Sequence, residues 1–395
     1  MTRKRSASSR DNDERLLEAA LAEIAAVGVD RLGMSAVARR AGLTTGALYS
    51  RYENVNELAA AVWTTRVRES HFAFCDAAVR ALVDGEPSVA LGDIDRDLTA
   101  PSLSTIAALE LLATARRVDE LDEVVTPDLE QWMKHWGAAP RSRERRRRAQ
   151  VVFTVGSLWG VLLHTLPHHR DLDWQPMLAA VARSYAQPYR LPGERFAPDR
   201  VGAVRADTGD SSQSALIDSV SAITARVGFE RATASRIARR AGLTPGAIYA
   251  RYRTKDELLV QAVEVLLAQR FTDDLETNSP RFAAPDVGTA TARIVGGYLS
   301  APRRDWRIFR VEAQLASRHR PQLAATLDRV QEDAIRLYLD AIGARTDEDR
   351  RALDTLARFA QLIPLGLAFA DLVAPGVTAT DWRYVLVPLL SPEAA

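Results

Sequence analysis

The sequence predicts an all-α protein that contains the same module twice. The first observation is a repeat, because residues 38–52 read ARRAGLTTGALYSRY and residues 238–252 read ARRAGLTPGAIYARY, 200 positions further on. The second is apolar periodicity of helical spacing, with no convincing strand pattern anywhere in the chain. Self-similarity at a fixed offset indicates that a whole folding unit has been duplicated.

The composition fits a large intracellular protein with several cores. The chain has 395 residues, 47% of them hydrophobic, and a formal net charge of +1. A single cysteine, Cys75, and the lack of a signal-peptide pattern favour a reducing cytoplasm. The apolar runs 151–163 and 362–373 are too short or too interrupted to span a membrane, so we expect buried core helices and no membrane partner.

Each repeat begins with two predicted helices. The first helix ends at Gly28 in the first copy and at Gly228 in the second, and the next helix ends at Gly42 or Gly242. Glycine at the second position permits a left-handed backbone and a close approach of two helices, which is the turn that a helix-turn-helix requires.

A third helix follows the turn in each copy. Thr44 and Thr244 stand where an N-cap belongs, and Pro245 suits the first helical position because its missing N–H is not needed there. The third helix is therefore predicted to start at residue 45 or 245. A helix-turn-helix present twice in one chain predicts the reading of two neighbouring DNA half-sites.

Weaker anchors continue the repeat into the long helical regions after each helix-turn-helix. Glu110 and Arg116 align with Glu312 and Arg318 at an offset of 202. A segment rich in Pro, Gly and Ser separates the modules, and fully extended it would reach about 90 Å. The predicted domains are an N-terminal arm with the first helix-turn-helix at 1–57, a helical domain at 58–187, a linker at 188–214, a second helix-turn-helix at 215–257 and a second helical domain at 258–395. The basic residues of the arm, which we expect to be disordered in isolation, are Arg3, Lys4, Arg5 and Arg10.

These motifs resemble the tetracycline-repressor (TetR) family of bacterial transcriptional regulators. The resemblance lies in the AGL turn, the T-x-G-A-x-Y helix and the following aromatic, and it covers about 45 residues in each copy. It implies two TetR-like modules, each with a DNA-binding domain and a helical effector and dimerisation domain. Here the two modules of one chain would pair as an intrachain pseudodimer.

The resemblance also implies which residues contact a double-stranded DNA operator. Small side chains would face base edges and leave specificity to hydroxyls, close backbone approach and thymine methyl contacts. The implied base-facing residues are Thr45, Gly46, Ala47 and Ser50 in the first copy and Pro245, Gly246, Ala247 and Ala250 in the second. The implied backbone contacts are Tyr49, Arg51, Thr44 and Ser35, then Tyr249, Arg251, Thr244, Ser235 and Lys255.

Two details of this comparison differ between the copies or need a structural interpretation. The first copy has Val55 where the second has Lys255, so the second half-site is predicted to be held slightly more strongly. Tyr52 and Tyr252, just after the recognition helices, are interpreted as packing residues.

The helical domains are predicted to bind a small-molecule effector, because aromatic residues gather near the centre of each. Aromatic residues at helical spacing usually pack in a core. The more specific interpretation is that they line one apolar pocket in each module. The candidate lining residues are Trp132, Trp136, Phe153, Trp159 and His164, with Tyr298, Trp306, Phe309, Tyr338 and Phe369 in the second module. Neither a cofactor nor a metal is predicted, because Pro167 interrupts the spacing of His164, His168 and His169.

Further features leave alternatives open. The arginines between Arg141 and Arg148 fit a solvated helix start better than a second nucleic-acid patch.

The favoured function is a DNA-binding regulator, a repressor released by its effector, that acts as a monomeric pseudodimer with further homodimerisation open. A regulator with one or both readers silent, acting through protein partners, is the alternative. No nucleophile motif, phosphate loop or metal spacing supports an enzyme.

Overall fold

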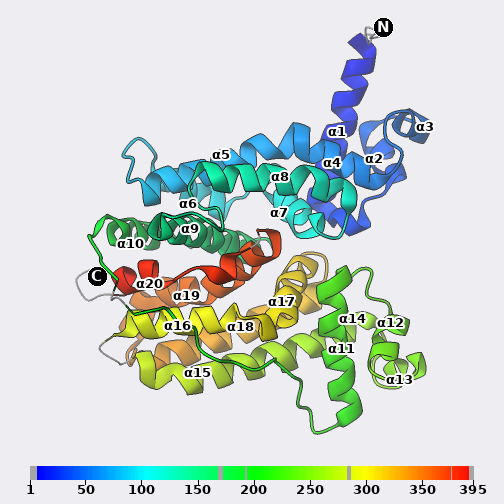
Figure 1. The fold of residues 1–395 in the computed structure, drawn as a ribbon. Coiled ribbons are helices and arrows are strands. Elements are labelled where there is room, and N and C mark those ends of the chain that lie inside the picture. Colours follow the sequence, from blue (N-terminus) through cyan, green and yellow to red (C-terminus); the bar gives the residue numbers. More distant parts are fainter. Residues whose placement is uncertain (1–6, 168–171, 192–193, 283–285, 375, 391–395) are drawn as a thin grey trace. The chain divides into compact units, whose positions relative to one another are not determined.

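The computed structural model is helical throughout the residues that it describes, and these contain no strand (Figure 1). It describes residues 7–167, 172–191, 194–282, 286–374 and 376–390. The chain divides into two compact units, which are described separately: Met1–Asp76 with Pro101–Trp132, and Ala77–Ala100 with Met133–Ala395. This division differs from the predicted domain boundaries.

The first unit holds the first helix-turn-helix and the helices that support it. Its core includes the fully buried Leu16, Ile24, Val37, Leu48 and Leu58. Its elements are α1 (Ala7–Val27), η1 (Val29–Arg31), α2 (Met34–Ala41), α3 (Thr45–Tyr49), α4 (Val55–Val62), η2 (Trp63–Val67), most of α5 (Arg68–Ala78), α7 (Leu103–Ala115) and most of α8 (Asp119–His135). Arg10 lies within α1, so it is not part of an unstructured arm, whereas Arg3, Lys4 and Arg5 lie outside the described residues.

The second unit joins four elements of the first module to the whole second module. Its first-module elements are η3 (Val79–Val83), α6 (Leu91–Thr99), α9 (Arg145–Thr165) and α10 (Gln175–Ala186). Its second-module elements are α11 (Ser211–Val227), α12 (Ala234–Arg240), α13 (Pro245–Tyr249), α14 (Lys255–Val263), η4 (Glu264–Ala268), α15 (Gln269–Phe282), α16 (Val287–Tyr298), η5 (Ala301–Arg303), α17 (Arg304–Ser317), α18 (Pro321–Ala341), α19 (Asp347–Val373), η6 (Val377–Ala379) and α20 (Arg383–Leu389).

Helices α9 and α19 join the two modules at a glycine contact. The backbones approach so closely that a Cβ atom on Gly366 would collide with the carbonyl oxygen of Gly156, and one on Gly160 would collide with that of Leu362. Beside the glycines, the rings of Trp159 and Phe369 pack edge to face at 5.3 Å. The two apolar segments that the sequence predicted as core helices therefore pack on each other, and this contact explains why the end of the first module clusters with the second.

Part of α19 could cross a membrane by length and composition alone. This part, Leu353–Val373, has a mean hydropathy of 1.5, and 72% of its most apolar window is buried inside the structure. Burial against neighbouring helices accounts for the apolar character, as the sequence predicted for a core helix.

The predicted linker is held against the second module over much of its length (Figure 1). Asp199 forms ion pairs with Arg281 at 2.5 Å and Arg293 at 3.3 Å, and its backbone N–H donates to the carbonyl oxygen of Arg293. A Cβ atom on Gly296 or Gly297 would press against this segment. This part of the linker is therefore anchored to the second module, where Gly296 and Gly297 on α16 leave room for it.

Candidate nucleic-acid interfaces and cavity

The first helix-turn-helix has the local geometry that its sequence predicts. Gly42 has a φ of +66° and ends α2 in the left-handed conformation. The Thr44 hydroxyl accepts a hydrogen bond from the backbone N–H of Ala47 at 3.2 Å and so caps α3. The turn and cap fix where α3 starts, which determines the side chains that it exposes.

The second helix-turn-helix has the same backbone arrangement but lacks the capping hydrogen bond from the threonine side chain. Gly242 has a φ of +70°, and α13 begins at Pro245 as expected. Thr244 occupies the N-cap position, but its side chain makes no capping hydrogen bond. The sequence expectation of a capping hydroxyl is therefore wrong here, and the fixed φ of Pro245 supports the helix start instead.

Both recognition helices are anchored on one face and open on the other. Leu48 and Ile248 are buried, whereas the side chains of Tyr49 and Tyr249 are 56% and 60% exposed. Large exposed aromatic side chains on a short helix are available to a partner rather than to the core. Of the other implied contacts, Ser35, Thr44, Gly46, Ser50, Ser235, Thr244, Pro245, Gly246 and Ala250 are exposed, and Thr45, Ala47 and Ala247 are half-buried.

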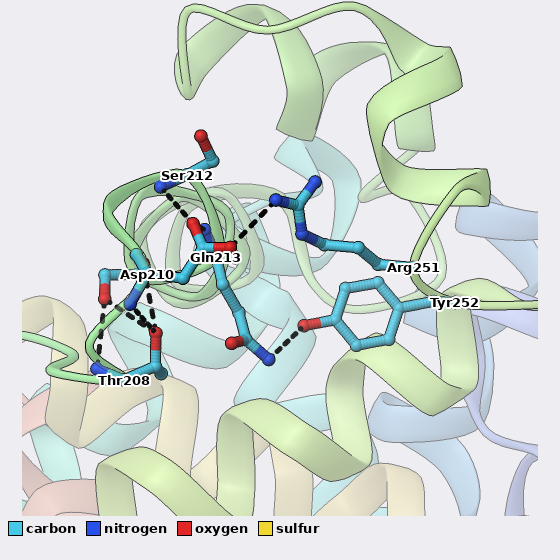
Figure 2. A network of polar contacts seen from close by, with 7 residues as sticks. Thr208, Asp210, Ser212, Gln213, Arg251 and Tyr252 are labelled. Atoms are coloured by element: carbon cyan, nitrogen blue, oxygen red, sulfur yellow. Dashed lines mark hydrogen bonds and ion pairs between the residues drawn. The ribbon is translucent and has the colours of Figure 1, made fainter.

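The two arginines implied as phosphate contacts are both paired with aspartates. Arg51 forms an ion pair with Asp13, and Arg251 donates to Asp210 at 2.9 Å (Figure 2). Asp13 lies within α1 and Asp210 is the N-cap of α11, the first helix of the second module, so the two aspartates stand at different positions of the repeat. Nothing in the helix-turn-helix motif indicated these partners, because they lie about 40 residues earlier in the chain.

Asp210 has two roles at the start of α11. Its carboxylate caps the helix by accepting from the backbone N–H groups of Ser212 at 2.8 Å and Gln213 at 3.1 Å (Figure 2). The hydrogen bond from Arg251 and these backbone bonds lower the pKa of Asp210. Asp210 therefore ties Arg251, which follows α13, to the first turn of α11.

Lys255 lies against its own domain. Its ammonium donates to the carbonyl oxygens of Phe229 at 2.9 Å and Glu230 at 3.4 Å, and it sits 4.2 Å from the centre of the Phe229 ring. Desolvation by this burial lowers the pKa of Lys255. In this arrangement the lysine caps the turn after α11, whereas the resemblance implied a contact with phosphate.

The tyrosines after the recognition helices pack inward. Tyr252 is buried, and its hydroxyl accepts a hydrogen bond from the Gln213 side chain at 3.2 Å (Figure 2). Tyr52 is half-buried. Tyr252 therefore has the packing role that the sequence suggested.

The arginine-rich segment at the start of α9 makes structural contacts. Arg146 donates to the carbonyl oxygens of Tyr185 and Gln187, at 2.8 and 2.7 Å. Arg147 pairs with Asp84, and the buried Arg148 donates to backbone carbonyls. The preferred interpretation of a solvated helix start is therefore wrong for these three residues, because their guanidinium groups bind chain segments distant in sequence.

A cavity of about 570 Å³ lies in the second unit. Three predicted effector residues line it: Tyr298, Trp306 and Tyr338. Its wall is mostly apolar, which is typical of a small-molecule site, and helix α10 of the first module closes one side with Met177 and Ala180. Both modules therefore contribute to one cavity.

The other predicted effector residues do not line this cavity. Phe309 and Phe369 are fully buried, and Phe153, Trp159 and His164 are buried in α9. In the first unit, Trp132 donates its indole N–H to Asp76 at 2.8 Å; in the second, Trp136 packs beneath the guanidinium of Arg147. These aromatics fill cores, the more usual role of aromatics at helical spacing. His168 and His169 lie outside the described residues, and within these no group of three or more His, Cys, Asp or Glu side chains is placed to hold a metal.

Sequence reasoning missed the polar residues of the cavity. Arg303 and Arg310, from η5 and α17, are both buried and line it together with Asn278 and Gln361. Burial lowers the pKa of Arg303 and raises the pKa of the Tyr338 hydroxyl. Arg303 and Arg310 lie in a stretch of sequence with many charged residues, which is typical of a surface exposed to solvent. The local sequence therefore did not indicate that these two arginines line a cavity.

Comparison with known proteins agrees with the helix-turn-helix geometry. The family described as bacterial regulatory proteins, tetR family, matches this chain twice, at residues 16–62 and 216–262. Uncharacterized HTH-type transcriptional regulators of Mycobacterium bovis and of Mycobacterium tuberculosis are 30% identical to it over 118 residues. The match covers 30% of this chain and 60% of each relative, so it concerns part of each protein.

Proposed function

Because the model of the tetR family of bacterial regulatory proteins matches this chain twice, once at each helix-turn-helix, we propose that the chain is a cytoplasmic repressor that reads two half-sites from one polypeptide. The observation that carries this proposal is the matched pair of recognition helices, each with an exposed tyrosine, Tyr49 or Tyr249, followed two residues later by an arginine. The glycine contact between α9 and α19 supports an intrachain pair.

The two readers would share one duplex. The recognition helices would enter successive major grooves about 34–36 Å apart, the spacing of one DNA turn. Tyr49, Arg51 and their counterparts in the second copy would fix the register on phosphates. The operator need not be an exact palindrome, because the copies differ at Thr45 and Pro245.

Release of DNA would follow the binding of a small molecule in the cavity of the second module. A molecule that prefers the DNA-free state would weaken operator binding by a coupling energy of typically about 1–3 kcal/mol, and DNA would weaken its binding by the same factor. The apolar cavity, closed by helices of both modules, supports this step. We propose no catalytic reaction at the site.

Two matched double variants test the use of both readers. Tyr49→Phe with Arg51→Ala, and separately Tyr249→Phe with Arg251→Ala, should each weaken binding to an operator selected from random DNA. The selected sequences report the half-site spacing, and light scattering of the complex reports the number of chains. Full affinity after either double change would contradict two-reader binding and leave one silent reader.

Single variants of the paired aspartates serve as controls. Asp13→Asn and Asp210→Asn remove the charge that holds each arginine but leave the arginine in place. Asparagine is as good an N-cap as aspartate, so α11 should persist. Operator affinity should stay the same or rise, and a loss equal to that of the double variants would trace their effect to domain stability.

A further inference from the structure

Arg310 places a positive charge in the cavity without a carboxylate partner. The residue is 6% exposed and lines the cavity from α17. Its guanidinium donates to the Tyr298 hydroxyl at 3.4 Å and to the backbone carbonyl of Gln361 at 3.1 Å, and it lies 5.0 Å from the Phe271 ring centre. All three partners are neutral.

Two other buried arginines of the same helical domain have carboxylate partners. Arg307, one helical turn before Arg310, pairs with Asp371 at 2.7 Å. Arg358 pairs with Glu332 at 2.6 Å and Asp354 at 2.7 Å. A buried guanidinium stays charged, and its burial costs free energy when no opposite charge is near. Of these three arginines, only Arg310 has no carboxylate partner, and it lines the cavity.

The described wall around Arg310 supplies no such counter-charge. It contains the arginines Arg183, Arg303 and Arg310 but no Asp or Glu among its described residues. Most of the remaining wall is aliphatic or aromatic. The cavity therefore combines a positively charged guanidinium with a mostly apolar wall.

We propose that the effector is an amphipathic carboxylate whose head pairs with Arg310 and whose apolar body fills the cavity. This inference rests on the proposed function and specifies its ligand. Arginine binds carboxylates through two parallel hydrogen bonds, and a bound carboxylate would neutralise the buried charge. The hydroxyl of Tyr298, already within reach of the guanidinium, lies beside the head.

The proposal also fixes the stoichiometry at one acid for each chain. At the offset of 202 that aligns Glu110 with Glu312, the position of Arg310 corresponds to Ala108 in the first module. Ala108 is buried on α7 and has no charge to offer. Only the second module therefore carries this arginine at the corresponding position.

Calorimetric titration of the full chain with three matched probes tests the ligand class. Decanoate, 1-decanol and decylamine share an alkyl chain and differ in charge. Decanoate should bind one per chain, and the alcohol and the amine should bind at least about 10-fold more weakly. Failure of decanoate to bind, or equal binding of the alcohol or the amine, would overturn the proposal.

Variants of Arg310 test the residue. Arg310→Met should weaken decanoate binding by about 30-fold or more, because it removes one partner of a buried charge pair. Arg310→Lys keeps the charge and should stay within about 10-fold of the wild type. Arg336→Met, on the exposed face of α18, is the matched control and should bind decanoate normally. Equal binding by Arg310→Met and the wild type would overturn the proposal.

The two proposals fail in different measurements. Decanoate binding needs no DNA, so it is measured even if operator binding is lost. If decanoate binds through Arg310 but leaves operator affinity unchanged, the ligand class is supported and release by that ligand fails. If decanoate releases the operator equally from Arg310→Met, the inference fails while ligand-controlled regulation survives.

Discussion

The indole N–H of Trp306 donates a hydrogen bond to the backbone carbonyl oxygen of Leu266 at 3.1 Å. Trp306 lines the cavity, and Leu266 belongs to the π-helical η4 that continues α14. Helix α14 begins only six residues after the recognition helix α13 ends at Tyr249. The bond therefore links the cavity to the helix that follows the second helix-turn-helix. Single π-helical turns such as η4 are frequently found at functional sites.

Trp306→Phe should reduce the coupling between effector and operator. The ring volume largely remains, so decanoate binding should change by less than about 10-fold, whereas the release of operator by decanoate should diminish because the carbonyl of Leu266 loses its donor. Fluorescence anisotropy of a labelled operator, with and without decanoate, measures both. Trp136→Phe, outside the cavity, is the control and should leave coupling intact. Undiminished coupling in Trp306→Phe would exclude this route.

Gly366→Ala should destabilise the joint between the modules. The added methyl group would overlap the backbone of Gly156, which cannot move aside as a side chain can. We expect a loss of about 1–3 kcal/mol or more in the free energy of unfolding, measured by urea denaturation. Gly92→Ala in α6 is the control, since its methyl would meet Gln175 at an ordinary 3.7 Å. If both variants lost the same free energy of unfolding, the loss would come from replacing glycine by alanine in a helix and not from the contact between α9 and α19.

His71 should make the first unit less stable in mild acid. Burial lowers the pKa of His71 to about 4, and its imidazole contacts Cys75 and the ring of Trp63. Between pH 6.5 and 4 the unfolded chain binds a proton that the folded chain does not, so stability falls as the pH falls through this window, by about 3 kcal/mol at most. His71→Gln should flatten the dependence, measured as unfolding free energy against pH. The exposed His135→Gln should retain the wild-type slope.

Lys255→Met should lower the melting temperature more than it alters DNA binding. The ammonium binds the carbonyls of Phe229 and Glu230, so its loss removes a contact that holds the second helix-turn-helix together. The slope of log affinity against log salt should stay at its wild-type value, whereas Arg251→Met should reduce that slope by about one unit. A reduced slope in Lys255→Met with an unchanged melting temperature would instead support the phosphate contact that the family resemblance implied.

The sequence by itself determined the recognition units. Gly42 and Gly242 adopt the left-handed turn, Thr44 caps α3, and Tyr49 and Tyr249 are exposed, as their local motif indicated. These features depend on residues within one or two helical turns of each other. Caps, turn glycines and helical periodicity act at that range, so a linear pattern contains the physics that fixes them.

Only the tertiary structure decided how charges and close contacts are matched. Three features each involve residues far apart in the chain. They are the ion pair of Arg251 with Asp210, the contact of the linker with α16, and the neutral groups around Arg310. A guanidinium on an exposed helix and one in a cavity look alike in sequence. What distinguishes them is the partner that folding brings within hydrogen-bond distance, and burial then sets the cost of having none.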